Sequence, residues 1–398
     1  MILSEVAVSR VDSDTLRIRF GYIRFCQSKK YGYIADTIRI YPMEKKLQFG
    51  FKEMQQVLKQ IGFIDSFKGQ WTAIEQKENR YLKELRHMAT IESIGSSTRI
   101  EGATLTDGEV EKLLKSVKIS KFKSRDEQEV VGYYEALDVI LDNYDNIKLS
   151  ESYIKQLHGI LLKHSSKDTR HKGHYKNLSN QVVANYPGGK QVTIFKTTEP
   201  HLTGKEMEEL VEWTNSAFKK GELHPLIIIA TFVYEFLSIH PFQDGNGRLS
   251  RLITTLLLMQ HGYQFVQYVS FEGLIEERKK DYYKALMTGQ KNRYKATEKI
   301  DHWALFFFNC MASLIQKLEH KYQAYSKMGA YLNERQKTIL DFIKKKAPVK
   351  LSDIVEATGI NRSTLKKDLN YLVSENSITR MGQGKSTVYV VKVKTQKQ

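Results

Sequence analysis

A run of twelve residues near the middle of the chain includes one side chain that can accept a proton and another that can bind a metal ion. The run from His240 to Arg251 reads HPFQDGNGRLSR. His240 offers an imidazole that titrates near neutral pH, which suits a general base. Asp244 offers a hard carboxylate oxygen, a type of ligand that Mg²⁺ prefers. This part of the run therefore predicts proton transfer beside a divalent cation.

The second half of the run predicts a phosphate site. Gly245 and Gly247 flank Asn246, so consecutive backbone amides can turn inward and surround an anion. The run also opens a predicted helix, whose N-terminus adds partial positive charge. Arg248 and Arg251 are three residues apart, on adjoining positions of one helix face, where both guanidinium groups can bind phosphate oxygens. Each feature alone is common in loops and helix caps, but their combination within one run favours phosphate chemistry.

The run resembles the Fic family motif HxFx(D/E)GNGRxxR at all eight fixed positions. Residues 173–176 (GHYK) and a predicted hairpin over Gln181 to Phe195 are similar to the region that precedes the motif in this family, including its substrate-docking flap. The resemblance covers roughly residues 90 to 310. It implies a mainly α-helical core with a β-hairpin flap.

The resemblance also implies an activity, the transfer of AMP from ATP to a Ser, Thr or Tyr hydroxyl of a protein, including this protein itself. His240 would take the proton of that hydroxyl, and Asp244 would hold Mg²⁺ on the α- and β-phosphates. Such transfer depends mainly on positioning and charge stabilisation. The implied phosphate contacts are a cradle of Gly245, Asn246 and Gly247 and two β/γ-phosphate ligands, Arg248 and Arg251.

Two further segments resemble substrate-binding parts of the family. The hairpin would align a target protein by backbone pairing along its edge. Residues 281–286 (DYYKAL) are similar to the helix that lines the adenine pocket, with Tyr282 as the contact, although a tyrosine there can equally be part of the core. Gln290 stands where relatives often have Asn, which leaves the base preference open. Donors of UMP or phosphocholine remain alternatives, since the motif recognises phosphates.

An upstream segment resembles the inhibitory motif of the family, (S/T)xxxE(G/N). It runs from Ser97 through Glu101 to Gly102. The resemblance implies that Glu101 pairs with Arg251 and takes the place of the γ-phosphate, so that ATP binds unproductively. The same glutamate could instead position a water that removes AMP. Relatives with this motif are typically homodimers.

The composition predicts a soluble globular protein of more than one folded unit. The chain has 398 residues, of which 41% are hydrophobic. Its 62 Lys and Arg against 45 Asp and Glu give a net charge of +17, which favours polyanionic partners or simply a solvated basic surface. Cys26 and Cys310 could form at most one disulfide. We expect a cytoplasmic protein, because this use of cysteine fits a reducing compartment, and no membrane segment, because no apolar run is long enough to span a bilayer.

Local patterns predict how the chain is divided. Residues 1–42 stay unassigned and could belong to an over-long start. We expect an N-terminal helical region over 43–145, a Fic core over 146–322 and a winged helix-turn-helix over 328–398. Three capping boxes are predicted to start helices, at Thr106/Glu109, Ser124/Glu127 and Thr203/Glu206.

The winged helix supports an alternative function. The protein could be a DNA-binding transcriptional regulator whose Fic core senses a nucleotide or removes AMP, or the winged helix could dock a protein. Against a degenerate core stands the complete set of motif residues. Kinase activity is disfavoured because the phosphate-transferring, Doc-like branch of the family usually has Lys at the position of Gly247. The predicted recognition helix presents Asn361, Arg362, Ser363, Thr364, Lys366 and Lys367.

Overall fold

The computed structural model describes residues 43–75, 80–116, 122, 124–185, 191–327, 334–374, 377–382 and 384–391. The predicted mainly α-helical class is confirmed, since the described strands form only two two-stranded antiparallel sheets. Segment 1–42, which contains Cys26, and the predicted hairpin turn at 186–189 lie outside these residues. Cys310 is buried with a free thiol. Within the described part of the chain, no helix has the length and apolar character needed to cross a membrane.

The first described elements are helices that precede the motif. In chain order they are α1 (Met43–Lys46), α2 (Phe51–Glu75), α3 (Arg80–Ile100), α4 (Asp107–Ser116), α5 (Arg125–Asn143), the 3₁₀ turn η1 (Tyr144–Asn146) and α6 (Glu151–Leu161). A hairpin and the central helices follow. They are β1 (Gln181–Asn185), β2 (Gln191–Lys196), α7 (Pro200–Lys220), α8 (Pro225–Ile239), α9 (Asn246–Gln260), η2 (Gln264–Tyr268), α10 (Phe271–Glu277), α11 (Lys279–Gln290) and α12 (Asp301–Lys327).

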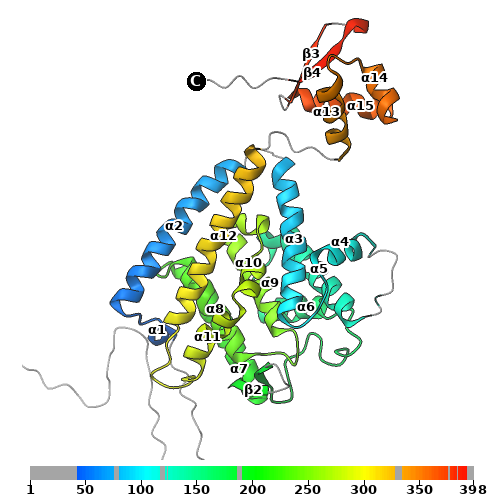
Figure 1. Cartoon of the computed structure of the whole chain (residues 1–398). Helices are drawn as coiled ribbons and strands as arrows, with labels where there is room; N and C mark the ends of the chain where they lie inside the picture. The colour runs from blue at the N-terminus through cyan, green and yellow to red at the C-terminus, as the bar shows by residue number, and fades with distance from the viewer. Residues whose placement is uncertain are drawn as a thin grey trace, which may run out of the picture. The chain divides into compact units, whose positions relative to one another are not determined.

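Among the helices from α1 to α12, α8 and α9 are the most completely buried. The sequence of α8, PLIIIATFVYEFLSI, is apolar on all sides, so it is stable only where other helices surround it. Helices α7, α9 and α12 pack against α8, and α12 also runs alongside α2 (Figure 1). The motif begins in the loop between α8 and α9. The two helices therefore fix both ends of that loop.

Two of the three predicted capping boxes are present. Ser124 Oγ accepts from the amide of Glu127 at 3.1 Å, and the Glu127 carboxylate accepts from the amide of Ser124 at 3.1 Å. Thr106 and Glu109 make the same reciprocal pair ahead of α4, at 3.4 and 2.8 Å. These side chains satisfy amides that a first helical turn leaves without partners.

The third predicted capping box is wrong. Thr203 lies inside α7, and its hydroxyl donates to the carbonyl of Glu199 at 3.0 Å, one helical turn earlier. The helix begins at Pro200, whose fixed φ and missing amide hydrogen suit the first helical position. Glu206 is therefore not a cap. It joins a buried polar network described below.

The hairpin predicted at Gln181 to Phe195 is present as β1 and β2. The two strands pair antiparallel, from Gln181 opposite Lys196 to Asn185 opposite Gln191, with an irregularity between Val182 and Val183. In a two-stranded sheet each strand has one unpaired edge, which can accept a further strand.

The C-terminal part forms the predicted winged helix-turn-helix. It contains α13 (Glu334–Lys346), α14 (Leu351–Thr358), α15 (Arg362–Ser374), β3 (Ile378–Met381), the short turn η3 (Gly384–Ser386) and β4 (Val388–Val391). Gly359 ends α14 with φ +66°, a conformation that glycine adopts without strain. This part has a hydrophobic core of its own, which includes Ile339, Ile354, Leu365 and Leu369.

Candidate active site

The loop between α8 and α9 is held in shape by its own side chains. His240 ends α8 in the left-handed region, with φ +54°, and Gly245 precedes α9 with φ +80°. The side chain of Asn246 accepts from the Phe242 amide at 2.9 Å and donates to the Phe242 carbonyl at 2.7 Å. Phe242 itself is buried. Asn246 thus shapes the loop with its side chain, and only its backbone amide is placed to bind an anion.

His158 on α6 packs against this loop and binds its backbone, a role that was not predicted from the sequence. Its ring stacks on Phe242 with centroids 3.8 Å apart. Nδ1 accepts from the Gly173 amide at 2.9 Å, so Nε2 must carry the hydrogen that it donates to the Asp244 carbonyl at 3.0 Å. Burial lowers the pKa of His158 to about 4, which keeps the ring neutral. Its only sequence signal is a histidine among the buried positions of an amphipathic helix.

His240 lies at a cavity and is neutral at physiological pH. Burial first, and then the positive charge of Lys176, lower its pKa to about 4. Nδ1 is buried, which leaves Nε2 as the nitrogen that a substrate can reach. A neutral imidazole with an accessible nitrogen can act as a general base.

Asp244 lines the same cavity and is ionised. Burial raises its pKa, but the charge of Arg248 and the Gly245 amide outweigh this and hold the pKa below its ordinary value. Arg125 Nη2 lies 3.6 Å from Oδ2. No group of three or more His, Cys, Asp or Glu residues in the described ranges could hold a metal ion. One carboxylate fits Mg²⁺ when the phosphates of a nucleotide supply further oxygens.

The two motif arginines lie in different surroundings. Arg248 is 1% exposed, with Nη1 3.2 Å from Glu129 Oε2 and Nη2 3.3 Å from Asp244 Oδ1. Arg251 lines the cavity, whereas Arg248 is not among its described lining residues. A direct contact of Arg248 with phosphate stays a prediction. Glu129 was missed by the sequence analysis because nothing in α5 marks it as different from a surface residue.

Arg251 is bound by Ser97 and Glu101, the two residues that are predicted to be inhibitory. Its Nε donates to Ser97 Oγ at 2.8 Å, and its Nη2 donates to the Ser97 carbonyl at 2.9 Å and to Glu101 Oε1 at 2.8 Å. Burial raises the pKa of Glu101, but Arg251 outweighs this effect and keeps the pKa below its ordinary value. The carboxylate is therefore charged and lies beside Gly247, at the N-terminus of α9.

The opposite wall of the cavity is mainly aromatic and apolar. Tyr282, Tyr283, Leu286 and Gln290 from α11 line it. Tyr282 is also part of the core, where its ring meets Trp303 edge-on. The position of Tyr282 is thus compatible with both interpretations, a contact with the adenine and a residue of the core.

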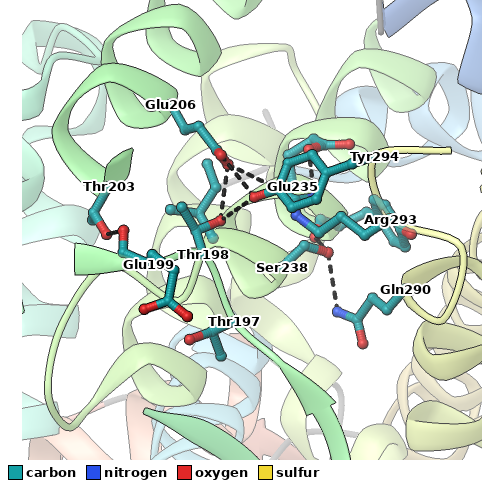
Figure 2. A network of polar contacts seen from close by, with 12 residues as sticks. Thr197, Thr198, Glu199, Thr203, Glu206, Glu235, Ser238, Gln290, Arg293 and Tyr294 are labelled. Atoms are coloured by element: carbon teal, nitrogen blue, oxygen red, sulfur yellow. Dashed lines mark hydrogen bonds and ion pairs between the residues drawn. The ribbon is translucent and has the colours of Figure 1, made fainter. Parts of the chain in front are cut away.

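The orientation of the Gln290 amide is fixed by a chain of hydrogen bonds. Ser238 gives its hydroxyl hydrogen to the Tyr234 carbonyl at 2.7 Å, so its oxygen can only accept from Gln290 Nε2, at 3.0 Å (Figure 2). The Gln290 carbonyl oxygen is left for another partner.

A buried polar network lies beneath this wall. Arg293 donates to Glu206 at 2.8 Å and to Glu235 at 3.0 Å, and Thr198 donates to Glu206 at 2.9 Å (Figure 2). Lys46 of α1 reaches the same network and lies 2.6 Å from Glu235. The network joins α7, α8 and the segment after α11. The sequence analysis did not predict it.

Residues 148–258 match the profile of the Fic/DOC family, and residues 335–385 match that of the DeoR-like helix-turn-helix domain. The chain contains a Fic domain. Curated relatives include the protein adenylyltransferase Fic of Drosophila willistoni, 28% identical over 207 residues, which are 52% of this chain and 39% of the relative. Its counterpart in Drosophila melanogaster is 30% identical over 202 residues, covering 50% and 38%. The chain thus spans about two-fifths of the length of these relatives.

Solved structures show the same fold. A Fic family protein from Desulfovibrio desulfuricans G20 has a TM-score of 0.59 at 22% identity and covers 86% of this chain and 97% of its own. A Fic domain containing signaling protein from Bacteroides thetaiotaomicron VPI-5482 has a TM-score of 0.55 at 25% identity and covers 66% and 97%.

The structure brings most of the predicted site residues of the Fic domain into one cavity. The predicted residues that line it are Glu101, His240, Asp244, Gly245, Asn246, Gly247, Arg251 and Tyr282. Ser97 lies behind Arg251, and Arg248 lies behind Asp244. The roles assigned to these residues stay predictions.

Proposed function

We propose that this protein is an autoinhibited adenylyltransferase that transfers AMP from ATP to a Ser, Thr or Tyr hydroxyl of a protein, including itself. One observation carries the proposal. A neutral imidazole, an ionised carboxylate, the first amides of α9 and Arg251 surround a single cavity whose other wall is aromatic. The Fic domain and the adenylyltransferase relatives support the same chemistry.

Each group has a task in this reaction. His240 Nε2 takes the proton of the target hydroxyl, whose oxygen forms a bond to the α-phosphorus while the bond to pyrophosphate breaks. The amides of α9 and Arg251 stabilise the phosphate charge. Asp244 would hold Mg²⁺, which supplies further charge neutralisation on the phosphates. The aromatic wall with Tyr282 would accept the base of the nucleotide.

The hairpin β1/β2 would dock the target. Phe195 of β2 lines the cavity together with His240, so the hairpin lies next to the proposed general base. A target segment paired to a strand edge through its backbone would present its hydroxyl side chain toward the base with little dependence on sequence. Segments of the protein's own chain that reach this edge would be modified too.

The pair of Glu101 and Arg251 would inhibit the reaction. While Arg251 binds the carboxylate, it cannot bind a γ-phosphate, and ATP cannot adopt the arrangement needed for in-line attack. Glu101 could also position a water for AMP removal. One preparation would be tested for both labelling and release of AMP. Release of AMP from labelled protein would indicate that Glu101 positions a water, and labelling without release would indicate inhibition alone.

Labelling with α-³²P-ATP and Mg²⁺ tests the proposal. The full-length wild type, Glu101→Gly and Glu101→Gly/His240→Ala would be incubated alone, and label on protein would be measured. We expect label to be strongest in Glu101→Gly and absent in the double variant. Absence of label in all three, with nucleotide binding intact, would contradict AMP transfer and favour another donor or AMP removal.

The helix-turn-helix match supports a second candidate function, DNA binding. Arg362, Lys366 and Lys367 are exposed at or near the N-terminal half of α15, the predicted recognition helix. Fluorescence anisotropy with labelled duplex DNA at several salt concentrations would test it. We expect Lys366→Ala/Lys367→Ala to weaken binding and to reduce the salt slope by about one to two. Binding that neither salt nor these substitutions change would contradict DNA recognition through α15.

A further inference from the structure

Lys176 is a buried lysine in the segment between α6 and β1, with 5% of its surface exposed. Its ammonium donates to Asn180 Oδ1 at 2.9 Å, to Thr197 Oγ1 at 2.8 Å and to the Ile239 carbonyl at 3.0 Å. An ammonium group has three hydrogens, and these acceptors use all of them. A charge removed from water needs such a full set of partners.

Lys176 contacts the backbone on both sides of His240. Its ammonium binds the carbonyl of Ile239, and its backbone amide donates to the carbonyl of Pro241 at 2.8 Å. His240 between them has φ +54° and ψ +61°, a left-handed conformation that is unfavourable for a residue with a Cβ. Such a conformation persists only where surrounding contacts enforce it. The two bonds from Lys176 are contacts of this kind.

The same ammonium joins the two ends of the hairpin. Asn180 immediately precedes β1, and Thr197 immediately follows β2. Thr197 Oγ1 lies 2.8 Å from the Asn180 carbonyl, and Asn180 Nδ2 donates to the Phe242 carbonyl at 2.9 Å. Both ends of the hairpin therefore connect to the loop that carries His240.

The buried network of Figure 2 anchors the second end of the hairpin to the helices. Thr198, the residue after Thr197, donates to Glu206 of α7. Arg293 links Glu206 to Glu235 of α8, the helix that ends at His240. This network contacts the hairpin end and α8, whereas Lys176 contacts the hairpin ends and the loop itself.

We propose that Lys176 is a positioning residue, which holds His240 in its left-handed conformation and fixes the hairpin to the His240 loop. The proposal rests on the function proposed above, because it takes His240 as the base and the hairpin as the docking strand. A target hydroxyl docked on the hairpin then meets Nε2 of His240 in one geometry. Loss of this geometry slows the transfer without removing the nucleotide pocket.

The charge of Lys176 adds an effect that a merely structural residue would not have. It is the second cause, after burial, of the low pKa of His240, while a hydrogen bond with the Leu237 backbone, Glu101 and Asp244 act in the opposite direction. Removing this charge therefore raises the pKa of His240. A change of the His240 titration separates the proposed role from a loss of packing.

Two substitutions in the full-length Glu101→Gly protein test the proposal. Lys176→Met removes the charge and all three donors at similar side-chain length. Lys172→Met is the matched control, because it removes a lysine of the same segment that is only half-buried. Thermal unfolding shows that each variant folds. His240 is followed by NMR of ¹³C-labelled histidine, assigned with His240→Ala.

We expect Lys176→Met to raise the pKa of His240 by at least about half a unit and to slow AMP labelling at least about tenfold. ATP affinity should stay within about twofold of the parent, and Lys172→Met should match the parent in every measurement. An unchanged titration and labelling rate in a folded Lys176→Met would overturn the proposal. If the parent itself carries no label, the proposed function fails, and the titration alone decides about Lys176.

A second variant keeps the proposal testable if Lys176→Met does not fold. Thr197→Val keeps the charge and the side-chain shape and removes one acceptor of the ammonium. We expect faster amide hydrogen exchange over residues 177–180 and 195–198, with the His240 titration unchanged. Unchanged exchange in this variant would overturn the hairpin part of the proposal.

Discussion

The carboxylate of Glu101 lies so close to Gly247 that a Cβ atom at residue 247 would stand 2.1 Å from Oε1. This contact places a negative charge on the first turn of α9, where free amides and the helix dipole favour an anion. Arg251 donates to the same oxygen at 2.8 Å. In the proposed reaction the γ-phosphate needs this guanidinium, so Glu101 and a productively bound ATP exclude each other.

Weakening the contact between Glu101 and Arg251 should increase the labelling rate, and removing it should increase the rate further. We expect Glu101→Gly to raise the initial rate of AMP labelling at least about tenfold, which requires about 1.4 kcal/mol of bias between the inhibited and the open arrangement. Glu101→Gln keeps an oxygen that can accept from Arg251 but loses the charge, and charge-assisted hydrogen bonds are the stronger kind. Its rate should lie between wild type and Glu101→Gly. Equal rates for all three proteins would remove the inhibition hypothesis.

Gly247→Ala should weaken the effect of Glu101. The new methyl group would clash with Oε1, and the carboxylate would have to leave the first turn of α9. We therefore expect Glu101→Gly to change the rate by less than about threefold in the Gly247→Ala background, against about tenfold in wild type. Gly102→Ala would not serve as a control, since Gly102 has φ +112°. Gly108→Ala in α4, where an added Cβ would meet no atom within 4 Å, is a suitable control.

The motif could be interpreted from sequence because its chemistry is local. His240, Asp244 and Arg251 lie within one short run, and the winged helix has its own helix boundaries and turn glycine. The motif and the winged helix could therefore be predicted without knowing which residues far apart in the sequence contact each other. The pair of Glu101 and Arg251, 150 positions apart, followed only from family resemblance.

The supporting residues could not be predicted, because nothing in their neighbourhood marks them. Lys176 looks like one basic residue in a basic segment, and its role depends on carbonyls of Ile239 and Pro241. Thr203 and Glu206 have the spacing of a capping box, but Pro200 starts the helix earlier and tertiary contacts engage Glu206. A local pattern was overridden by burial.

An ion pair at the end of α3 should determine how firmly Glu101 is held. Arg99 donates to both oxygens of Glu276 of α10, at 2.8 and 3.0 Å. Partly exposed pairs of this kind contribute up to about 1 kcal/mol, so we expect Glu276→Gln to raise the labelling rate about two- to fivefold. The neighbouring Glu277→Gln, which removes a surface pair with Lys317, is the matched control.

The effect of Glu276→Gln should depend on Glu101. In the Glu101→Gly background the ion pair has no inhibitory contact to support, so Glu276→Gln should leave the rate unchanged. A similar increase in both backgrounds would show that Glu276 acts on catalysis by another route.

The base should remain active in mildly acidic solution. The pKa of His240 is lowered to about 4, so the neutral form that accepts a proton is present above that value and is lost only below it. We expect kcat/KM of Glu101→Gly, which reports on the free enzyme, to show no His240 titration between pH 5.5 and 7.5, the range bracketing the ordinary histidine value of about 6.5. A decline with a midpoint near 6.5 would mean that His240 is more solvated than the structure indicates.

The alkaline side should report on Lys176. Burial lowers its pKa to about 8, against the opposing effects of Glu199 and Glu206 and together with Arg293. The ammonium that binds Ile239, Asn180 and Thr197 is therefore complete below pH 8 and loses a proton above it. We expect the labelling rate of Glu101→Gly to fall as pH rises through about 8.

Lys176→Arg separates this titration from other causes of an alkaline decline. A guanidinium stays charged throughout the accessible pH range, so the decline near pH 8 should disappear even if the larger side chain lowers the plateau rate. Rates would be measured from pH 6.5 to 9.5 with nucleotide and Mg²⁺ saturating at each pH. A decline that persists unchanged in Lys176→Arg would assign it to another group and would leave Lys176 without a role in the pH dependence.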